Sequence, residues 1–303
     1  MEERLERILG RVGRWLGGEP VLTPLPGGIT NRNYRVNAGG ESFVLRLGGE
    51  GARLLGIDRR NEFAVSSIAA RLGVGAEVLS FIEEEDALLT CFVEGATMTP
   101  EAASRPEVLE RIVRSIRLYH EGPAFPGEFS PFATVRAYRA LALERGVKFP
   151  DRAALALETL ARIEGRVSPP ARLVPCHNDL LAGNFIDDGR AIRILDWEYA
   201  AMGDPFFDLG NFAANQRLEG RAVERLLELY EGAARPESLA RLSLLRLASD
   251  LRESFWGFLQ SGVSKIEFDF IGYAGEHLDR FLERTARPEL ETWLRALPAG
   301  GDS

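Results

Sequence analysis

The residues best suited to chemistry lie in the stretch "VPCHNDLLAGNFIDDGRAIRILDWEYA", residues 174–200. Within it, "HNDLLAGN" has the spacing H-x-D-x-x-x-x-N and contains Asp179 and Asn184, and "ILDWE" adds Asp196. Phosphoryl transfer from a nucleotide requires a carboxylate that orients the attacking hydroxyl and accepts its proton. It also requires a carboxylate and an amide oxygen that hold Mg²⁺ against the phosphates. We therefore predict that Asp179 is the catalytic residue and that Asn184 and Asp196 bind the metal.

The same stretch also has a purely structural interpretation. "HND" would cap a turn, and "NFIDDGRAIRILD" would form a β-hairpin with Asp188–Gly189 at its tip. The two interpretations are compatible, because such a hairpin brings Asn184 and Asp196 close together. The full spacing favours catalysis.

The first third of the chain alternates between strand-like runs and turns. The runs are "VLTPL", "NYRVNA", "SFVLRL", "EVLSFI" and "ALLTCFV". A helix is predicted before them, with one apolar face from Leu5 to Leu16 and an end at Gly17–Gly18. A second helix is predicted at about residues 58–72, with Asp58 as its N-cap.

From Pro100 onward the pattern is helical, apart from a β-rich insert at about residues 173–196. We predict an α+β protein with two lobes. Residues 1–95 would form a small β-sheet lobe that ends in a hinge, and residues 96–303 a larger, mainly helical lobe. A cleft between two lobes is a common binding site for small ligands.

These features resemble the protein-kinase-like fold, and more narrowly the choline/ethanolamine kinase and aminoglycoside phosphotransferase group, over most of the chain. The loop around Asp179 has the H-x-D motif that is typical of that group, whereas protein kinases have H-R-D. The resemblance implies that His177 supports this loop; the alternative is an ordinary buried histidine. It also implies that Asp208, in "DPFFDLGNF", braces the loop through backbone hydrogen bonds. A helix N-cap is the alternative for Asp208.

The resemblance also implies nucleotide-binding residues in the first lobe. Gly27 and Gly28, in "LPGGITNRNYRV", would let backbone N–H groups approach the phosphates of ATP, although Pro-Gly-Gly can also be just a turn. A kinase lobe needs a cation on its third strand and a Glu on the next helix to hold it. Arg46 in "FVLRL" and Glu62 in "NEF" occupy these positions. The alternative is a surface ion pair worth about 0–1 kcal/mol.

Strand alternation separates the two faces of the "SFVLRL" run. Arg46 shares a face with Ser42 and Val44, and the opposite face is wholly apolar: Phe43, Leu45 and Leu47. The apolar face is predicted to be core. The pattern does not say whether the face of Arg46 borders the cleft.

The segment "LLTCFVEG" is predicted to be the hinge, where backbone groups around Cys91 and Val93 would bind the adenine edge. Cys91 and Cys176 form no CxxC motif and no disulfide framework, and we interpret both as small buried residues.

The C-terminal stretch "ESFWGFLQSGVSKIEFDFIGYAGEHLDRFL" resembles the choline/ethanolamine kinase family. The resemblance implies that Tyr199, Trp256 and Tyr273 line the pocket for an amine, where aromatic faces would hold a quaternary ammonium by cation–π attraction. The alternative is that these aromatic side chains belong to the core. The chain departs from the eukaryotic pattern at Leu259, in place of a second Trp, and at Asn215, in place of an acidic residue.

Glu198, beside Tyr199, is a candidate for the same pocket. Its carboxylate could serve the substrate, Mg²⁺ or a structural arginine.

The leading prediction is an ATP- and Mg²⁺-dependent kinase that acts on the hydroxyl of choline or a close analogue such as ethanolamine. A second hypothesis keeps the chemistry and changes the acceptor to thiamine or an aminoglycoside. A third is a catalytically silent, nucleotide-binding module. Such modules commonly lose the catalytic Asp or a metal ligand, and neither is lost here.

Composition narrows the partners. A formal net charge of −8 over 303 residues argues against a nucleic-acid partner, because phosphate contacts need clustered basic residues. The sequence has no apolar run of the ~20 residues that span a bilayer and no signal-peptide core. We therefore expect a cytoplasmic protein without membrane insertion, and the sequence carries no sign of its oligomeric state.

Overall fold

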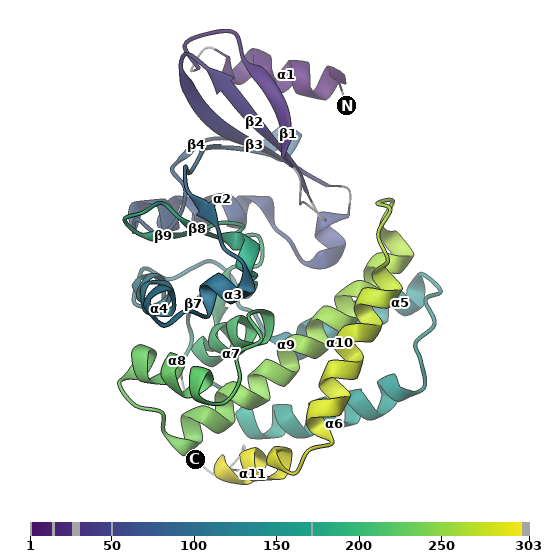
Figure 1. The fold of residues 1–303 in the computed structure, drawn as a ribbon. Helices are drawn as coiled ribbons and strands as arrows, with labels where there is room; N and C mark the ends of the chain where they lie inside the picture. The colour runs from purple at the N-terminus through teal and green to yellow at the C-terminus, as the bar shows by residue number, and fades with distance from the viewer. Residues whose placement is uncertain (1, 14–15, 26–30, 50, 171, 299–303) are drawn as a thin grey trace.

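The computed structural model describes residues 2–13, 16–25, 31–49, 51–170 and 172–298. Figure 1 shows a β-sheet lobe with α1 against it, above a larger helical lobe, so the α+β architecture with two lobes is as predicted. The division at residue 95 stays a prediction. Within the described residues, no helix is both long and apolar enough to cross a bilayer.

The strands form one large sheet and two small ones, in the orders β1-β2-β3-β5-β4, β6-β8-β9 and β10-β7, with antiparallel neighbours throughout. Their bounds are β1 Val21–Leu25, β2 Asn31–Ala38, β3 Glu41–Gly48, β4 Val78–Ile82, β5 Ala87–Cys91, β6 Ala96–Thr97, β7 Val174–Cys176, β8 Phe185–Asp187, β9 Ile192–Ile194 and β10 Ala201–Gly203.

The helices make up most of the second lobe. The α-helices are α1 Glu2–Val12, α2 Arg59–Arg71, α3 Pro100–Ala103, α4 Pro106–His120, α5 Pro131–Glu144, α6 Arg152–Val167, α7 Pro205–Asn215, α8 Arg221–Glu231, α9 Pro236–Val263, α10 Phe270–Thr285 and α11 Glu289–Ala296. Three short 3₁₀ turns are η1 Ala52–Leu55, η2 Glu83–Glu85 and η3 Ala182–Asn184.

The sheet lobe has its own core on one face of the large sheet. Phe43, Leu45 and Leu47 of β3 are buried there against α1, and this confirms the predicted apolar face. The helix α1 ends at Val12, earlier than predicted, because glycines at 10 and 13 weaken the helix before the Gly17–Gly18 pair is reached.

The helix α2 begins where the sequence predicts. The Asp58 carboxylate accepts hydrogen bonds from the backbone N–H groups of Arg60 (2.9 Å) and Asn61 (3.2 Å), two donors that the first helical turn leaves free. This cap places Glu62 in the first turn, facing the sheet.

The centre of the helical lobe is α9, a helix of 28 residues that packs against α5, α6, α7, α10 and α11. Apolar side chains of these helices form one large buried cluster. A second cluster surrounds β8 and β9 and the helices α4, α7 and α8. The hairpin β8–β9, predicted from "NFIDDGRAIRILD", is confirmed, with Phe185 opposite Ile194.

The close approach of α7 and α9 depends on Gly210. A Cβ at this position would lie 2.7 Å from the backbone N of Arg246 and 3.0 Å from the backbone O of Leu242. We predict that Gly210→Ala lowers the free energy of unfolding by about 1–3 kcal/mol, because backbone atoms cannot move aside as a side chain can. Denaturant unfolding measures this.

Gly165→Ala is the matched control for Gly210→Ala. Gly165 is exposed in α6, and a Cβ added there would meet nothing within 4 Å. The same substitution should therefore raise the free energy of unfolding by up to about 1 kcal/mol. Equal effects at the two positions would contradict the packing argument.

Candidate active site

The loop that follows β7 holds the predicted catalytic residue. His177 is fully buried; its Nε2 lies 2.9 Å from the Leu195 carbonyl, and its Nδ1 accepts the Asp179 backbone N–H at 3.2 Å. Burial lowers the pKa of His177, so the ring is neutral, with its proton on Nε2. Asn178 adopts a left-handed backbone conformation with φ of 66°, which Asn tolerates better than most residues. His177 thus acts on the backbone of this loop.

Asp208 on α7 lies beneath the loop. Its carboxylate accepts backbone N–H groups of His177 (2.8 Å) and Asn178 (2.7 Å), the Tyr119 hydroxyl (2.7 Å), and contacts His120 Nε2 at 3.1 Å. The N-cap of α7 is Asp204, so the N-cap alternative for Asp208 is wrong. Burial alone would raise the pKa of Asp208, but the hydrogen bonds and charges of its neighbours outweigh burial and leave the pKa below its ordinary value.

We predict that Asp208→Asn lowers the free energy of unfolding by about 3 kcal/mol. An amide turns one acceptor oxygen into a donor among buried donors, and each unmet group costs ~1–3 kcal/mol. Because the folded state depresses the pKa of Asp208, its contribution is present above the ordinary value near 3.8 and is lost as the pH falls below it. Unfolding measured from pH 3 to 7 should therefore show a shallower acid limb for the variant.

Asp279→Asn is the control for this measurement, since Asp279 is exposed and forms a surface ion pair with Arg152. It should change stability by no more than about 0.5 kcal/mol. A similar small effect of Asp208→Asn would contradict the role of Asp208 as the support of the loop.

Asp179 itself points away from this support. Its carboxylate accepts a hydrogen bond from Arg252 on α9 at 2.9 Å, and its side chain is 13% exposed. Burial raises its pKa to about 8; Arg252 opposes the rise, and the Glu253 carboxylate adds to it. A carboxyl with a pKa near neutrality is suited to exchange a proton with an alcohol acceptor.

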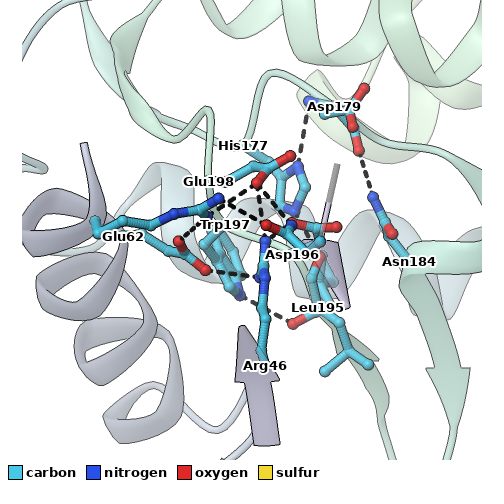
Figure 2. Close-up of polar contacts among 12 residues, drawn as sticks. Arg46, Glu62, His177, Asp179, Asn184, Leu195, Asp196, Trp197 and Glu198 are labelled. Carbon is cyan, nitrogen blue, oxygen red and sulfur yellow. Dashed lines mark hydrogen bonds and ion pairs between the residues drawn. The ribbon is translucent and has the colours of Figure 1, made fainter. Parts of the chain in front are cut away.

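The predicted metal ligands are joined by the β8–β9 hairpin. The Leu195 N–H donates to the Asn184 carbonyl at 2.8 Å, which sets Asn184 beside the segment that leads to Asp196. The Asn184 side-chain amide donates to the Asp179 carbonyl at 2.9 Å, and this turns its oxygen away from that carbonyl (Figure 2). Asp196 has a left-handed backbone with φ of 68°, a costly conformation of the kind found at functional sites.

Arg46 and Glu62 form a buried ion pair at 2.7 Å, with side chains 13% and 3% exposed, so the surface-pair alternative is wrong. Figure 2 shows Arg46 reaching from β3 between Glu62 and Asp196. Arg46 donates to Asp196, and also to Glu198 at 3.1 Å. This cluster ties the sheet lobe to the segment after β9.

Glu198 takes part in the same cluster. Besides Arg46, it accepts from Arg59 at 3.1 Å and from Asn31 at 2.9 Å. Of its three predicted roles, the contacts match the structural arginine; its place beside the substrate or Mg²⁺ stays a prediction.

Three carboxylates, those of Glu62, Asp196 and Glu198, therefore face two guanidinium groups, those of Arg46 and Arg59. Burial raises the pKa of Asp196 to about 7, with Arg46 opposing the rise. The excess negative charge and the oxygen donors of Asn184 and Asp196 suit a hard divalent cation such as Mg²⁺.

The aromatic residues predicted for the acceptor pocket lie at two depths. Trp256 is buried, with its ring 5.6 Å from Tyr273 and 5.8 Å from Phe270, and belongs to the large core cluster. Tyr273 is half-buried and donates its hydroxyl to Glu253 at 2.7 Å. Tyr199 lies under the Arg252 guanidinium, 5.2 Å from its ring centroid.

Leu259 and Asn215, where the chain departs from the family pattern, differ in burial. Leu259 is fully buried in the core, and Asn215 is partly exposed at the last position of α7.

The nucleotide side of the site is described only in part. Gly27 and Gly28 lie outside the described residues. At the hinge, the Cys91 N–H already donates to the Glu77 carbonyl at 2.8 Å, so that group is taken. Cys91 is half-buried instead of buried, at the last position of β5 with its Sγ 3.8 Å from the Glu77 carboxylate, while Cys176 is buried as predicted. Val93 is half-buried beyond the end of β5.

Sequence reasoning missed one amide and three charged residues of this site that come from other elements: Asn31, Arg59, Arg252 and Glu253. A signal for the last two existed. The sequence "LRLASDLRESFWGF" in α9 places four charged residues among apolar residues, and a helix with so much apolar surface must bury some of them.

Fold and site together define a phosphotransferase of the protein-kinase-like class: a small antiparallel sheet above a helical lobe, an Arg–Glu pair between sheet and helix, and an H-x-D loop. The chain belongs to the phosphotransferase enzyme family, whose model matches residues 21–244. A solved choline/ethanolamine kinase family protein from Mesorhizobium loti is 30% identical, superposes with a TM-score of 0.84 and is matched over 97% of both chains. The predicted family and fold are thereby confirmed.

Two further relatives are informative. Protein LicA of Haemophilus influenzae is 29% identical over 209 residues, which cover 67% of this chain and 61% of that protein. The match therefore spans less than two thirds of that relative. A solved LicA in complex with AMP is 20% identical, with a TM-score of 0.72, and the match covers 91% of this chain and 98% of that one.

Proposed function

We propose that the protein is an ATP- and Mg²⁺-dependent kinase that phosphorylates the hydroxyl of a small amino alcohol, choline or ethanolamine. The observation that carries this is the convergence of Asp179, Asn184 and Asp196: Asn184 is hydrogen-bonded to the Asp179 backbone, and Asp196 is bonded to the buried Arg46 of the sheet lobe. The loop of Asp179, the two proposed metal ligands and Arg46 of the sheet lobe thus lie close together (Figure 2), which supports the proposal.

The roles follow from the chemistry of each group. Asp179 would accept a hydrogen bond from the acceptor hydroxyl and take its proton as the new P–O bond forms and the bond to the leaving nucleotide breaks. Asn184 and Asp196 would hold Mg²⁺, which, when bound, offsets the charge of the phosphate oxygens. Arg46, held by Glu62 and bonded to Asp196, would supply positive charge to the phosphates beside the metal ligands.

The nucleotide would enter from the sheet lobe, as the AMP complex of LicA suggests by likeness of fold. Gly27, Gly28 and the backbone near Val93 stay proposed contacts for it. Two free thiols agree with a reducing, cytoplasmic location, which we also propose.

The acceptor would be a compact cation. Around Asp179 lie the carboxylate of Glu253 and the rings of Tyr199 and Tyr273, and together these offer negative charge and aromatic faces. An aminoglycoside carries several ammonium groups and would need a wider acidic surface, so the observations favour the smaller acceptor.

An ATP-consumption screen tests the proposal, with choline, ethanolamine, thiamine, homoserine and aminoglycosides as acceptors. We expect turnover with choline or ethanolamine and only in the presence of Mg²⁺. Turnover with only an aminoglycoside or only thiamine would show that the acceptor is that compound and not choline or ethanolamine. Thermal stabilisation by Mg·ATP without any turnover would instead establish the silent nucleotide-binding module.

A further inference from the structure

Arg252 and Glu253 on α9 form a buried charged pair next to Asp179, where the proposed acceptor would bind. The Arg252 side chain is 4% exposed, and one terminal nitrogen donates both to the Asp179 carboxylate at 2.9 Å and to the Glu253 carboxylate. Its guanidinium also stands over the Tyr199 ring, 5.2 Å from the centroid. A cation between two carboxylates and above an aromatic face is the environment that a protein offers to an ammonium ligand.

The N–H donors of the Arg252 guanidinium are not equally engaged in hydrogen bonds. Structural arginines commonly engage carboxylates with two parallel N–H groups of the planar fork. Here one nitrogen serves both carboxylates, while the buried Nε has no acceptor among the described residues. The position suits a single small cationic centre better than it suits a guanidinium.

We propose that the Arg252 guanidinium occupies the place of the acceptor's ammonium group, and that the acceptor displaces it and binds Glu253 through a primary ammonium. This inference rests on the proposed function. One nitrogen contacts both carboxylates, so Asp179 and Glu253 lie within two hydrogen-bond lengths of each other, about 6 Å. A two-carbon amino alcohol in a bent conformation would place its hydroxyl on Asp179 and its ammonium on Glu253.

The arrangement selects among amines by their N–H donors. Glu253 is 6% exposed, and the Tyr273 hydroxyl already donates to one of its oxygens at 2.7 Å. When Arg252 leaves, the other oxygen loses its donor, and a buried carboxylate oxygen without a donor is costly. A primary ammonium restores the hydrogen bond, whereas a quaternary ammonium has no N–H to give. Ethanolamine should therefore bind better than choline.

The wild-type enzyme tests this directly with ethanolamine, its N-methyl and N,N-dimethyl derivatives, and choline. We expect KM to rise as methyl groups are added, by at least tenfold from ethanolamine to choline. A KM for choline equal to or below that for ethanolamine would overturn the inference and leave the proposed kinase function intact. Failure to phosphorylate any of the four would count against the proposed function itself.

Variants test the roles of Glu253 and Arg252 separately. Glu253→Gln should raise KM for ethanolamine at least tenfold and leave KM for ATP unchanged. Arg252→Ala removes the internal competitor and should lower KM for ethanolamine and choline severalfold, while Arg252→Lys keeps a competing cation and should not. Arg246→Ala, a matched buried arginine of α9 that pairs with Glu219, should leave both KM values unchanged.

Two results would contradict the displacement. Arg252→Ala could raise KM for the amines, which would make Arg252 an acceptor-binding group instead of a competitor. Alternatively, the wild type could phosphorylate a hydroxy acid such as glycerate and lose this activity in Arg252→Ala, which would show that Arg252 recognises an anion. Thermal unfolding of each variant identifies any that fail to fold, and the methyl series on the wild type does not depend on them.

Discussion

Replacing Asp179 by Asn is expected to lower kcat by about 10²–10⁴-fold, the contribution of a positioned general base. The amide keeps the shape of the side chain but cannot take the proton of the acceptor hydroxyl. Nucleotide binding should persist, because Asn184, Asp196 and Arg46 are unchanged. Kinetics of phosphate transfer, with a thermal-shift titration of Mg·ATP, measure the two effects separately.

The pH dependence of the wild type provides a second readout for Asp179. Burial raises its pKa to about 8, so the fraction in the basic form, and with it kcat, should increase as the pH rises toward that value. The residual activity of Asp179→Asn should lack this limb. The exposed control Asp279→Asn should keep both the rate and the limb. Undiminished transfer by Asp179→Asn would remove Asp179 from the mechanism.

Asp196→Asn is expected to abolish the Mg²⁺ dependence and to lower kcat/KM by at least about 10³-fold, since a bound metal supplies several kcal/mol of charge stabilisation. An amide oxygen is a weaker ligand for a hard cation than a carboxylate. Activity over a Mg²⁺ titration measures the loss. Activity that saturates at the same Mg²⁺ concentration as the wild type would exclude Asp196 as a ligand.

The stability of Asp196→Asn should move in the opposite direction. Burial raises the pKa of Asp196 to about 7, which means that the fold disfavours its charge, and its removal relieves the excess of three carboxylates over two guanidinium groups. A variant that loses activity but keeps or gains stability indicates a residue that serves function and lowers the free energy of unfolding. Glu198→Gln is the contrast, because it removes the negative charge that Arg46 and Arg59 share and puts an NH₂ donor among buried donors, and it should destabilise the protein.

The sequence was sufficient to predict those features of the fold that depend only on residues close together in the chain. Alternation in β3 separates an apolar face from the face of Arg46, Asp58 caps α2, and the Asp188–Gly189 turn closes the β8–β9 hairpin. Each of these follows from backbone geometry and burial within a few residues. The predicted end of α1 was wrong because Gly10 within the helix and Gly13 directly after it end the helix before the glycine pair at 17 and 18 is reached.

The sequence by itself predicted the phosphotransferase class, because the H-x-D-x-x-x-x-N motif, Asp196 and the Arg46–Glu62 positions supply the kinds of group that phosphoryl transfer needs. Beyond the Arg46–Glu62 pair, only the tertiary structure decided which charges meet. Arg252 reaches Asp179 across 73 positions, and Glu198 meets Arg46 across 152. The free energy of such contacts comes from desolvation and Coulomb attraction in a shared interior, and these depend on spatial distance and burial, which no local pattern of residues encodes.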